Sequence, residues 1–178
     1  MGRYSLATMF GVGLSKKAPG TAGSAVAALI AYYILTLPFS TILLAGGTIL
    51  FTLWGTKSAT KYMVANNCEH DPSEIVIDEL AGQWLTYVIA FKFAQAMECA
   101  SGSPCGQDFY AMFPNLPLAM FLGFLLFRLF DILKPWPISL ADRKVKGGFG
   151  VMFDDLLAAI PAGILLAFLF PMVVMFFA

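Results

Sequence analysis

The stretch FRLFDILKPWPISLADRKVKGGFGVMFDDL, residues 127–156, decides the fold of this chain. It contains four of the eleven acidic and five of the eleven basic residues, and long apolar runs flank it on both sides. Lys134-Pro135-Trp136-Pro137 is expected to end the preceding helix, because proline cannot continue one. Gly147-Gly148-Phe149-Gly150 is expected to form a flexible loop before the next helix. A charged segment between two membrane-length runs predicts a polar site at the face of a membrane.

The composition indicates an integral membrane protein. Of the 178 residues, 59% are hydrophobic and 12% are charged, and the mean hydropathy is +0.78. Soluble domains carry about 25% charged residues, so this surface cannot face water throughout. We expect one membrane-embedded domain over residues 1–178. A removable signal peptide is not expected, because Lys16 and Lys17 follow the first apolar stretch where a small-residue cleavage site would stand.

Five apolar runs predict an all-α fold, a polytopic helical bundle in the membrane. Their approximate bounds are 21–37, 39–56, 72–97, 113–133 and 156–177. Residues 4–14 are apolar but too short to span, so a short interfacial or re-entrant helix is expected there. Asp71-Pro72-Ser73-Glu74 predicts the start of the third helix, with Asp as N-cap, Pro at the first position and Glu closing a capping box.

The basic residues predict the orientation. Five spans would place three segments on one side of the membrane: 1–20, 57–79 and 128–155. Ten of the eleven Lys and Arg residues lie in these segments, and the eleventh, Lys92, lies within a span. By the positive-inside rule this side is cytoplasmic, so the N-terminus would be inside and the C-terminus outside. Cys99 and Cys105 fall in an outer loop, where an oxidising compartment would permit a disulfide, and whether it forms is left open.

Carboxylates crowd onto the same side. Five of them lie at or within the ends of spans: Asp78, Glu79, Asp131, Asp154 and Asp155. Two carboxylates about 4 Å apart repel by roughly 4 kcal/mol at an effective dielectric near 20. Either nearby Arg and Lys or a hard divalent cation must offset that, and Mg²⁺ prefers carboxylate and phosphate oxygens. Ion pairs that merely hold the bundle are the alternative, and Arg128 with Asp131 has the i, i+3 spacing for one.

The segment from Lys16 to Ser24 has the parts of an anion-binding turn. Glycines free backbone N–H groups, Thr21 and Ser24 supply hydroxyls, and Lys17 supplies charge. An ordinary capped turn fits these residues equally well. The chain has one histidine and lacks the arginine that a cysteine phosphatase would need after Cys68. A metal-activated water is therefore the nucleophile that remains for attack on phosphorus.

Four segments together resemble the phosphatidylglycerophosphatase A family of bacterial membrane lipid phosphatases. They are GLSKKAPGTAGS (13–24), SEIVIDELAGQW (73–84), FRLFDILKPWPI (127–138) and ADRKVKGGFGVMFDDLLA (141–158). The resemblance covers most of the chain. It implies Mg²⁺-dependent hydrolysis of phosphatidylglycerophosphate to phosphatidylglycerol and inorganic phosphate, at the cytoplasmic face of the inner membrane.

Roles follow from the resemblance and the charge pattern together. The expected metal ligands, one of which would be the general base, are Asp78, Glu79, Asp154 and Asp155. Asp131 would be a further ligand or would orient the others. The expected phosphate-binding residues are Lys17, Thr21, Ser24, Arg128, Lys134 and Arg143. The sequence leaves open which carboxylate is the base.

Three other functions compete with a lipid phosphatase. A small transporter or channel would also use intramembrane carboxylates, but it would distribute them across the depth of the bilayer. A phosphotransferase acting on lipid headgroups and a structural membrane subunit are the others. Membrane lipids are the expected partners, nucleic acid is not, and the oligomeric state is left open.

Overall fold

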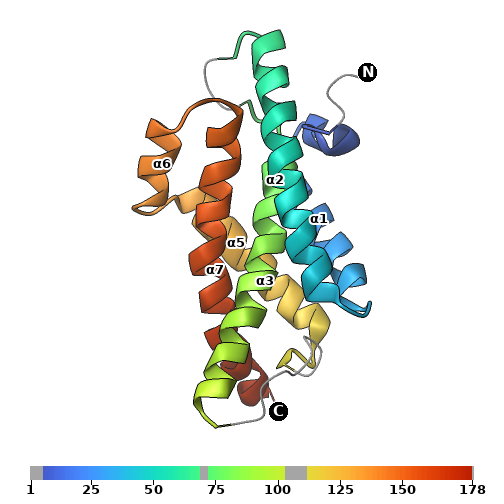
Figure 1. Cartoon of the computed structure of the whole chain (residues 1–178), viewed down its shortest axis with the longest axis vertical. Coiled ribbons are helices and arrows are strands. Elements are labelled where there is room, and N and C mark those ends of the chain that lie inside the picture. The colour runs from blue at the N-terminus through green and yellow to red at the C-terminus, as the bar shows by residue number, and fades with distance from the viewer. Residues whose placement is uncertain (1–5, 69–71, 103–111, 178) are drawn as a thin grey trace.

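The computed structural model describes residues 6–68, 72–102 and 112–177, and the regular elements in these ranges are all helices. In chain order they are η1 (Met9–Leu14), α1 (Pro19–Leu35), α2 (Ser40–Ala65), α3 (Ile77–Ala100), α5 (Leu116–Leu133), α6 (Ile138–Lys144) and α7 (Gly147–Phe177). The long helices run roughly along the longest axis of the molecule, and short α6 lies beside the first half of α7 (Figure 1). The all-α prediction is confirmed.

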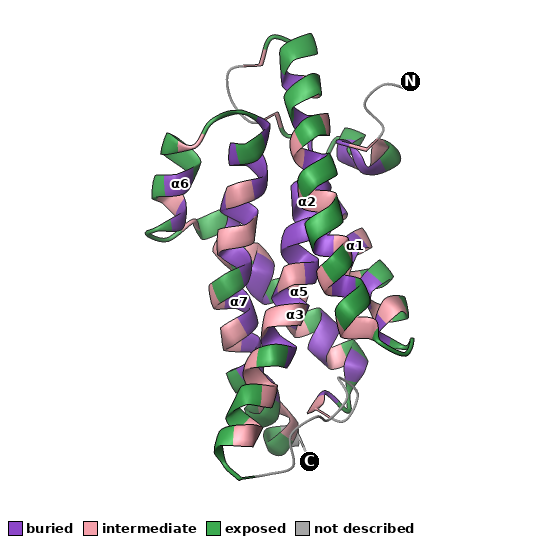
Figure 2. Cartoon of the chain, viewed as in Figure 1, coloured by how far each residue is buried: buried purple, intermediate pink, exposed green. Residues whose placement is uncertain are grey.

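Three of these helices, α2, α5 and α7, are long and apolar enough to cross a membrane. Their outward faces carry large exposed hydrophobic side chains, such as Leu53 and Trp54 on α2 and Phe121 on α5, and Figure 2 shows these faces as exposed. A surface this apolar requires a lipid environment. Helix α1 is apolar but has 17 residues, and α3 carries four charged residues, so their membrane crossing stays a prediction.

Helix α3 is the inner helix of the bundle. It packs against α1, α2, α5 and α7, and every residue from 75 to 84 is buried. Gly82 allows this close packing, because a Cβ there would lie 2.7 Å from the Phe127 ring and 3.1 Å from the Asp155 carbonyl oxygen. The acidic first turn of α3 is therefore held between α5 and α7, which supply the other charged residues.

The predicted start of the third helix is wrong. Helix α3 begins at Ile77, and its N-cap residue, Val76, makes no side-chain cap bond. The Val76 N–H instead donates to the Ala7 carbonyl oxygen at 2.9 Å, and Ile75 and Val76 are buried. Packing against the N-terminal segment keeps residues 72–76 out of the helix, and Asp71 lies outside the described residues.

The glycine-rich segment after Lys146 is also not a loop. Gly147 to Gly150 form the first turn of α7, because this turn packs directly on another helix. A Cβ on Gly148 would lie 2.5 Å from the Thr60 nitrogen of α2.

Helix α6 was not expected, since prolines precede it. The breaks at Pro38 and after Leu133 are confirmed, and the N-terminal apolar stretch contains η1, a 3₁₀ helix.

Candidate active site

A cavity of about 500 Å³ lies where the starts of α1, α3 and α7 meet the end of α5. Its lining residues are Ala18, Pro19, Gly20, Thr21, Ser73, Ile75, Asp78, Glu79, Arg128, Asp131, Ile132, Lys134, Asp154 and Asp155. All five carboxylates expected from the sequence are among them, although they come from three different helices. Each of the five residues is at most 8% exposed. The structure thus brings the separate helix ends together around one buried acidic cluster.

Arg128 lies at the centre of one part of this cluster. Its Nη1 is 2.5 Å from each carboxylate oxygen of Glu79 and 2.8 Å from Asp131 Oδ2. The Ser24 hydroxyl, which is fully buried, donates to Glu79 Oε2 at 2.7 Å. The i, i+3 ion pair between Arg128 and Asp131, weighed above as a purely structural alternative, is therefore present, and it extends to a second helix through Glu79.

Lys134 forms ion pairs with two other carboxylates, those of Asp142 and Asp154. It follows the last residue of α5, and its Nζ lies 2.6 Å from Asp142 Oδ1 on α6 and forms an ion pair with Asp154 Oδ2 on α7. Burial alone would lower the pKa of Lys134, but its hydrogen bonds to Asp142 and Asp154 outweigh burial and raise it. The same hydrogen bond from Lys134 lowers the pKa of Asp142. Asp142 was given no role from the sequence, because nothing local links it to a lysine eight residues away across a proline turn.

The lining carries more negative than positive charge. Five carboxylates share the cavity with two cations, Arg128 and Lys134. Asp154 Oδ1 and Asp155 Oδ2 are buried without a hydrogen-bond partner among the described residues. A buried, uncompensated carboxylate costs several kcal/mol, so this geometry favours a further positive charge.

The oxygen donors in the cavity suit a hard cation such as Mg²⁺. In the described ranges, no group of three or more acidic, histidine or cysteine side chains is arranged so that it could hold a metal ion. Mg²⁺ does not need one, because it commonly binds one or two carboxylates and takes its other ligands from water and substrate phosphate. Asp154 and Asp155 fit that requirement through their unpartnered oxygens.

The predicted phosphate-binding residues separate into two groups. Arg128, Lys134 and Thr21 line the cavity, and Ser24 is buried behind Glu79. Lys17 and Arg143 are exposed and do not line it. The expected anion-binding turn is close to the acids. A Cβ on Gly20 would lie 3.2 Å from the Arg128 guanidinium nitrogens, so the backbone of α1 forms part of the cavity wall.

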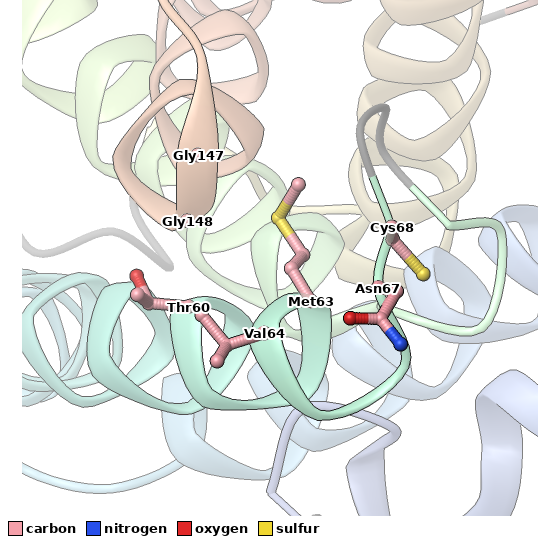
Figure 3. A pocket seen from close by; sticks show the side chains of 7 residues that line it. All are labelled: Thr60, Met63, Val64, Asn67, Cys68, Gly147 and Gly148. Atoms are coloured by element: carbon pink, nitrogen blue, oxygen red, sulfur yellow. The ribbon is translucent and has the colours of Figure 1, made fainter.

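A second cavity, of about 480 Å³, lies between the end of α2 and the first turn of α7. Its lining is shown in Figure 3 and consists of Thr60, Met63, Val64, Asn67, Cys68, Gly147 and Gly148. The Thr60 hydroxyl already donates to the Thr56 carbonyl oxygen of its own helix. None of these seven residues is charged, so this cavity does not offer the chemistry of the first.

Known proteins resemble this chain over most of its length. The sequence model of the family described as Phosphatidylglycerophosphatase A matches residues 5–170. A phosphatidylglycerophosphatase A of Escherichia coli is 36% identical over 91% of this chain and 80% of its own length. One of Haemophilus influenzae is 36% identical over 89% and 83%. A Bacteroides thetaiotaomicron protein named a putative phosphatidylinositol-3-phosphatase is 36% identical over 91% and 89%. No solved structure matches.

Proposed function

The chain belongs to the phosphatidylglycerophosphatase A family, and from this we propose that it hydrolyses phosphatidylglycerophosphate to phosphatidylglycerol and inorganic phosphate with Mg²⁺. The observation that carries the proposal is the cavity lined by five buried carboxylates and two cations. Of the four metal ligands expected from the sequence, Asp154 and Asp155 have oxygens without a partner among the described residues. This pair would hold the metal ion, with water and substrate phosphate as its other ligands. When bound, Mg²⁺ would lower the pKa of water and offset charge on the phosphoryl oxygens.

Arg128 and Lys134 bind the phosphate in this proposal. Both lie in the cavity wall, where each already pairs with carboxylate oxygens. Phosphate oxygens offer the same geometry to an arginine, which can bind them with two parallel hydrogen bonds. The incoming phosphate then replaces carboxylates as the partner of these cations. The cations stabilise the charge that develops as the group transfers.

The bond changes are those of a simple hydrolysis. The oxygen of a water attacks phosphorus, the bond from phosphorus to the glycerol oxygen breaks, and a carboxylate takes the proton of the water. That proton then reaches the leaving alcohol oxygen. The carboxylate that takes the proton is one of the five in the cavity lining.

A phosphoinositide is a second candidate substrate, because one of the relatives is named for such a lipid. The Bacteroides thetaiotaomicron relative is named for a phosphoinositide, whereas two others are named for phosphatidylglycerophosphate. Both lipids present a phosphomonoester on a headgroup at the membrane surface. A transporter receives less support, because the buried charges within the described ranges lie in one cavity and are not spread along the bundle.

We further propose that the cavity faces the cytoplasm at the inner membrane, with the N-terminus inside and the C-terminus outside. The exposed Lys and Arg residues support this, since most lie near the same end of the bundle as the cavity. They include Lys16 and Lys17 before α1, Lys57 and Lys61 late in α2, and Arg143, Lys144 and Lys146 around α6. Basic residues favour the cytoplasmic side.

Phosphate release by the purified protein tests the function. Phosphatidylglycerophosphate and phosphatidylinositol 3-phosphate are compared in the same detergent, each with Mg²⁺ and with EDTA. We expect faster release from phosphatidylglycerophosphate, and no release in EDTA. Full activity in EDTA would refute the proposed requirement for Mg²⁺. Faster release from the phosphoinositide would transfer the proposal to that lipid.

A further inference from the structure

Gln83 is a fully buried polar residue whose amide is unsatisfied. It is 0% exposed, and neither its Oε1 nor its Nε2 has a hydrogen-bond partner among the described residues. The Tyr87 hydroxyl donates to the Met120 carbonyl oxygen at 2.9 Å. Its oxygen also lies near the Gln83 amide and could accept from Nε2, but the two groups do not meet hydrogen-bond geometry in this structure. Such an amide costs about 1–3 kcal/mol when it is left unpaired.

Neighbouring buried polar groups on α3 are satisfied. The Thr86 hydroxyl donates to the Gly82 carbonyl oxygen at 3.0 Å. The Trp84 Nε1 donates to the Ala27 carbonyl oxygen at 3.0 Å. Gln83 is therefore an exception within its own helix, and an exception of this kind close to an active site points to function.

The helix register places Gln83 directly beneath the acidic cluster. Glu79, one turn earlier on the same face, contacts Arg128 of α5, and Tyr87, one turn later, contacts Met120 of α5. Gln83 lies between these two contacts. Because side chains on a helix lean toward its N-terminus, the amide of Gln83 leans toward the level of Arg128.

Two further unsatisfied atoms complement this amide. Within the part of the chain that the structure describes, Arg128 Nε is a buried donor without an acceptor and Asp155 Oδ2 is a buried acceptor without a donor. The carboxamide of Gln83 offers one acceptor and one donor. Asp155 is also close, since its carbonyl oxygen packs against the Gly82 position, next to Gln83 in the chain.

We propose that Gln83 is a positioning residue of this site. In the reactive arrangement its Oε1 accepts from Arg128 Nε–H and its Nε2 donates to Asp155 Oδ2. This bridge holds the phosphate-binding arginine against the carboxylate when phosphate draws Arg128 away from Glu79 and Asp131. The inference rests on the proposed phosphatase function and adds a residue that does not line the cavity.

The test uses Gln83→Met, which keeps the length of the side chain and removes both hydrogen-bonding atoms. We expect kcat on phosphatidylglycerophosphate to fall about 10–100-fold, as for other groups that orient active-site residues. The melting temperature should stay unchanged or rise, because an unsatisfied amide is removed. Thr86→Val is the control. It removes a buried hydroxyl, one turn away, that already donates to the Gly82 carbonyl oxygen, and kcat should stay unchanged.

A double-mutant cycle identifies the partner. Arg128→Lys keeps the positive charge but has no Nε–H, so Gln83→Met should lower kcat/KM much less in that background than in wild type. An equal loss in both backgrounds, or an unchanged kcat in wild type, would overturn the inference. A large drop in melting temperature or failure to fold would also overturn it, since the amide would then be structural. An inactive wild-type protein would instead refute the proposed function, and this inference with it.

Discussion

Arg128 Nη1 lies 2.5 Å from both carboxylate oxygens of Glu79, and this contact joins α5 to the first turn of α3. Both side chains are largely buried, 13% and 9% exposed. Glu79 depends on this contact, because without Arg128 its buried carboxylate would lose its cation and keep only the hydrogen bond from the Ser24 hydroxyl among the contacts described above. The same arginine faces the cavity, so the contact that stabilises the bundle also places the phosphate-binding cation.

Arg128→Ala is expected to damage both stability and activity. Removing one partner of a buried ion pair costs about 3–5 kcal/mol, and kcat/KM should fall about 100–1,000-fold with the loss of a charge that stabilises the transferring group. Thermal unfolding and phosphate release measure the two effects. Lys57→Ala, an exposed lysine on α2, is the matched control and should change neither.

Asp155→Asn should separate activity from stability. Asp155 Oδ2 is buried without a hydrogen-bond partner among the described residues, and five carboxylates share the cavity with two cations. An isosteric amide removes one of these mutually repelling charges and should raise the melting temperature by a few degrees. Phosphate release should fall at least about 100-fold, because a metal ligand or base is lost. A variant that is both less stable and fully active would contradict this assignment.

The ion pair between Lys134 and Asp142 should make stability depend on pH. The pKa of Asp142 is lowered in the fold, so its contribution is present above the unfolded pKa of about 4 and is lost as pH falls further. The pKa of Lys134 is raised, so its contribution is complete below about pH 10 and is lost as pH rises through the higher folded value.

Asp142→Asn tests this pH window. The wild type should unfold at a higher temperature than the variant at pH 7. The difference should be below about 1 kcal/mol because Asp142 is partly exposed, and it should vanish near pH 3. A difference that persists at pH 3 would show that the Asp142 side chain acts through packing and not through its charge.

Gly82→Ala should destabilise the site through packing. The added Cβ would lie 2.7 Å from the Phe127 ring and 3.1 Å from the Asp155 carbonyl oxygen, so α3 must move away from α5 and α7. We expect a loss of about 1–3 kcal/mol and lower activity. Gly46→Ala on α2 meets nothing within 4 Å and should be neutral or slightly stabilising, by up to about 1 kcal/mol. Equal effects of the two substitutions on melting temperature would refute the packing argument.

The elements that the sequence predicted well are those set by local properties. Proline positions placed the end of α5 before Pro135 and the break at Pro38, and hydropathy placed the apolar parts of α2, α5 and α7. The expected bounds were wrong at two ends, since α2 continues to Ala65 instead of ending at 56 and α7 begins at Gly147 instead of 156. The acidic residues were recognised because charges at the ends of apolar runs are rare without a function. Metal binding and the individual roles of these residues stay predictions.

The features that were missed depend on contacts distant in sequence. The start of α3 follows from the hydrogen bond between Val76 and Ala7, which outweighs a favourable capping sequence. Gly148 is helical because it packs on α2, although its composition indicates a loop. The buried amide of Gln83 lacks a partner among the described residues because of how the helices pack around it, so periodicity in the sequence could not reveal it.

The sequence by itself determined the helical class, the membrane environment and the residues that carry charge, because hydropathy and charge belong to each residue wherever it lies. Only the tertiary structure decided which charges meet. It paired Arg128 with Glu79 and Asp131, and Lys134 with Asp142 and Asp154. It left one oxygen each of Asp154 and Asp155 without a hydrogen-bond partner in the described ranges. The reason is physical: the energy of a buried charge depends on the distance to its neighbours, and packing between helices sets that distance.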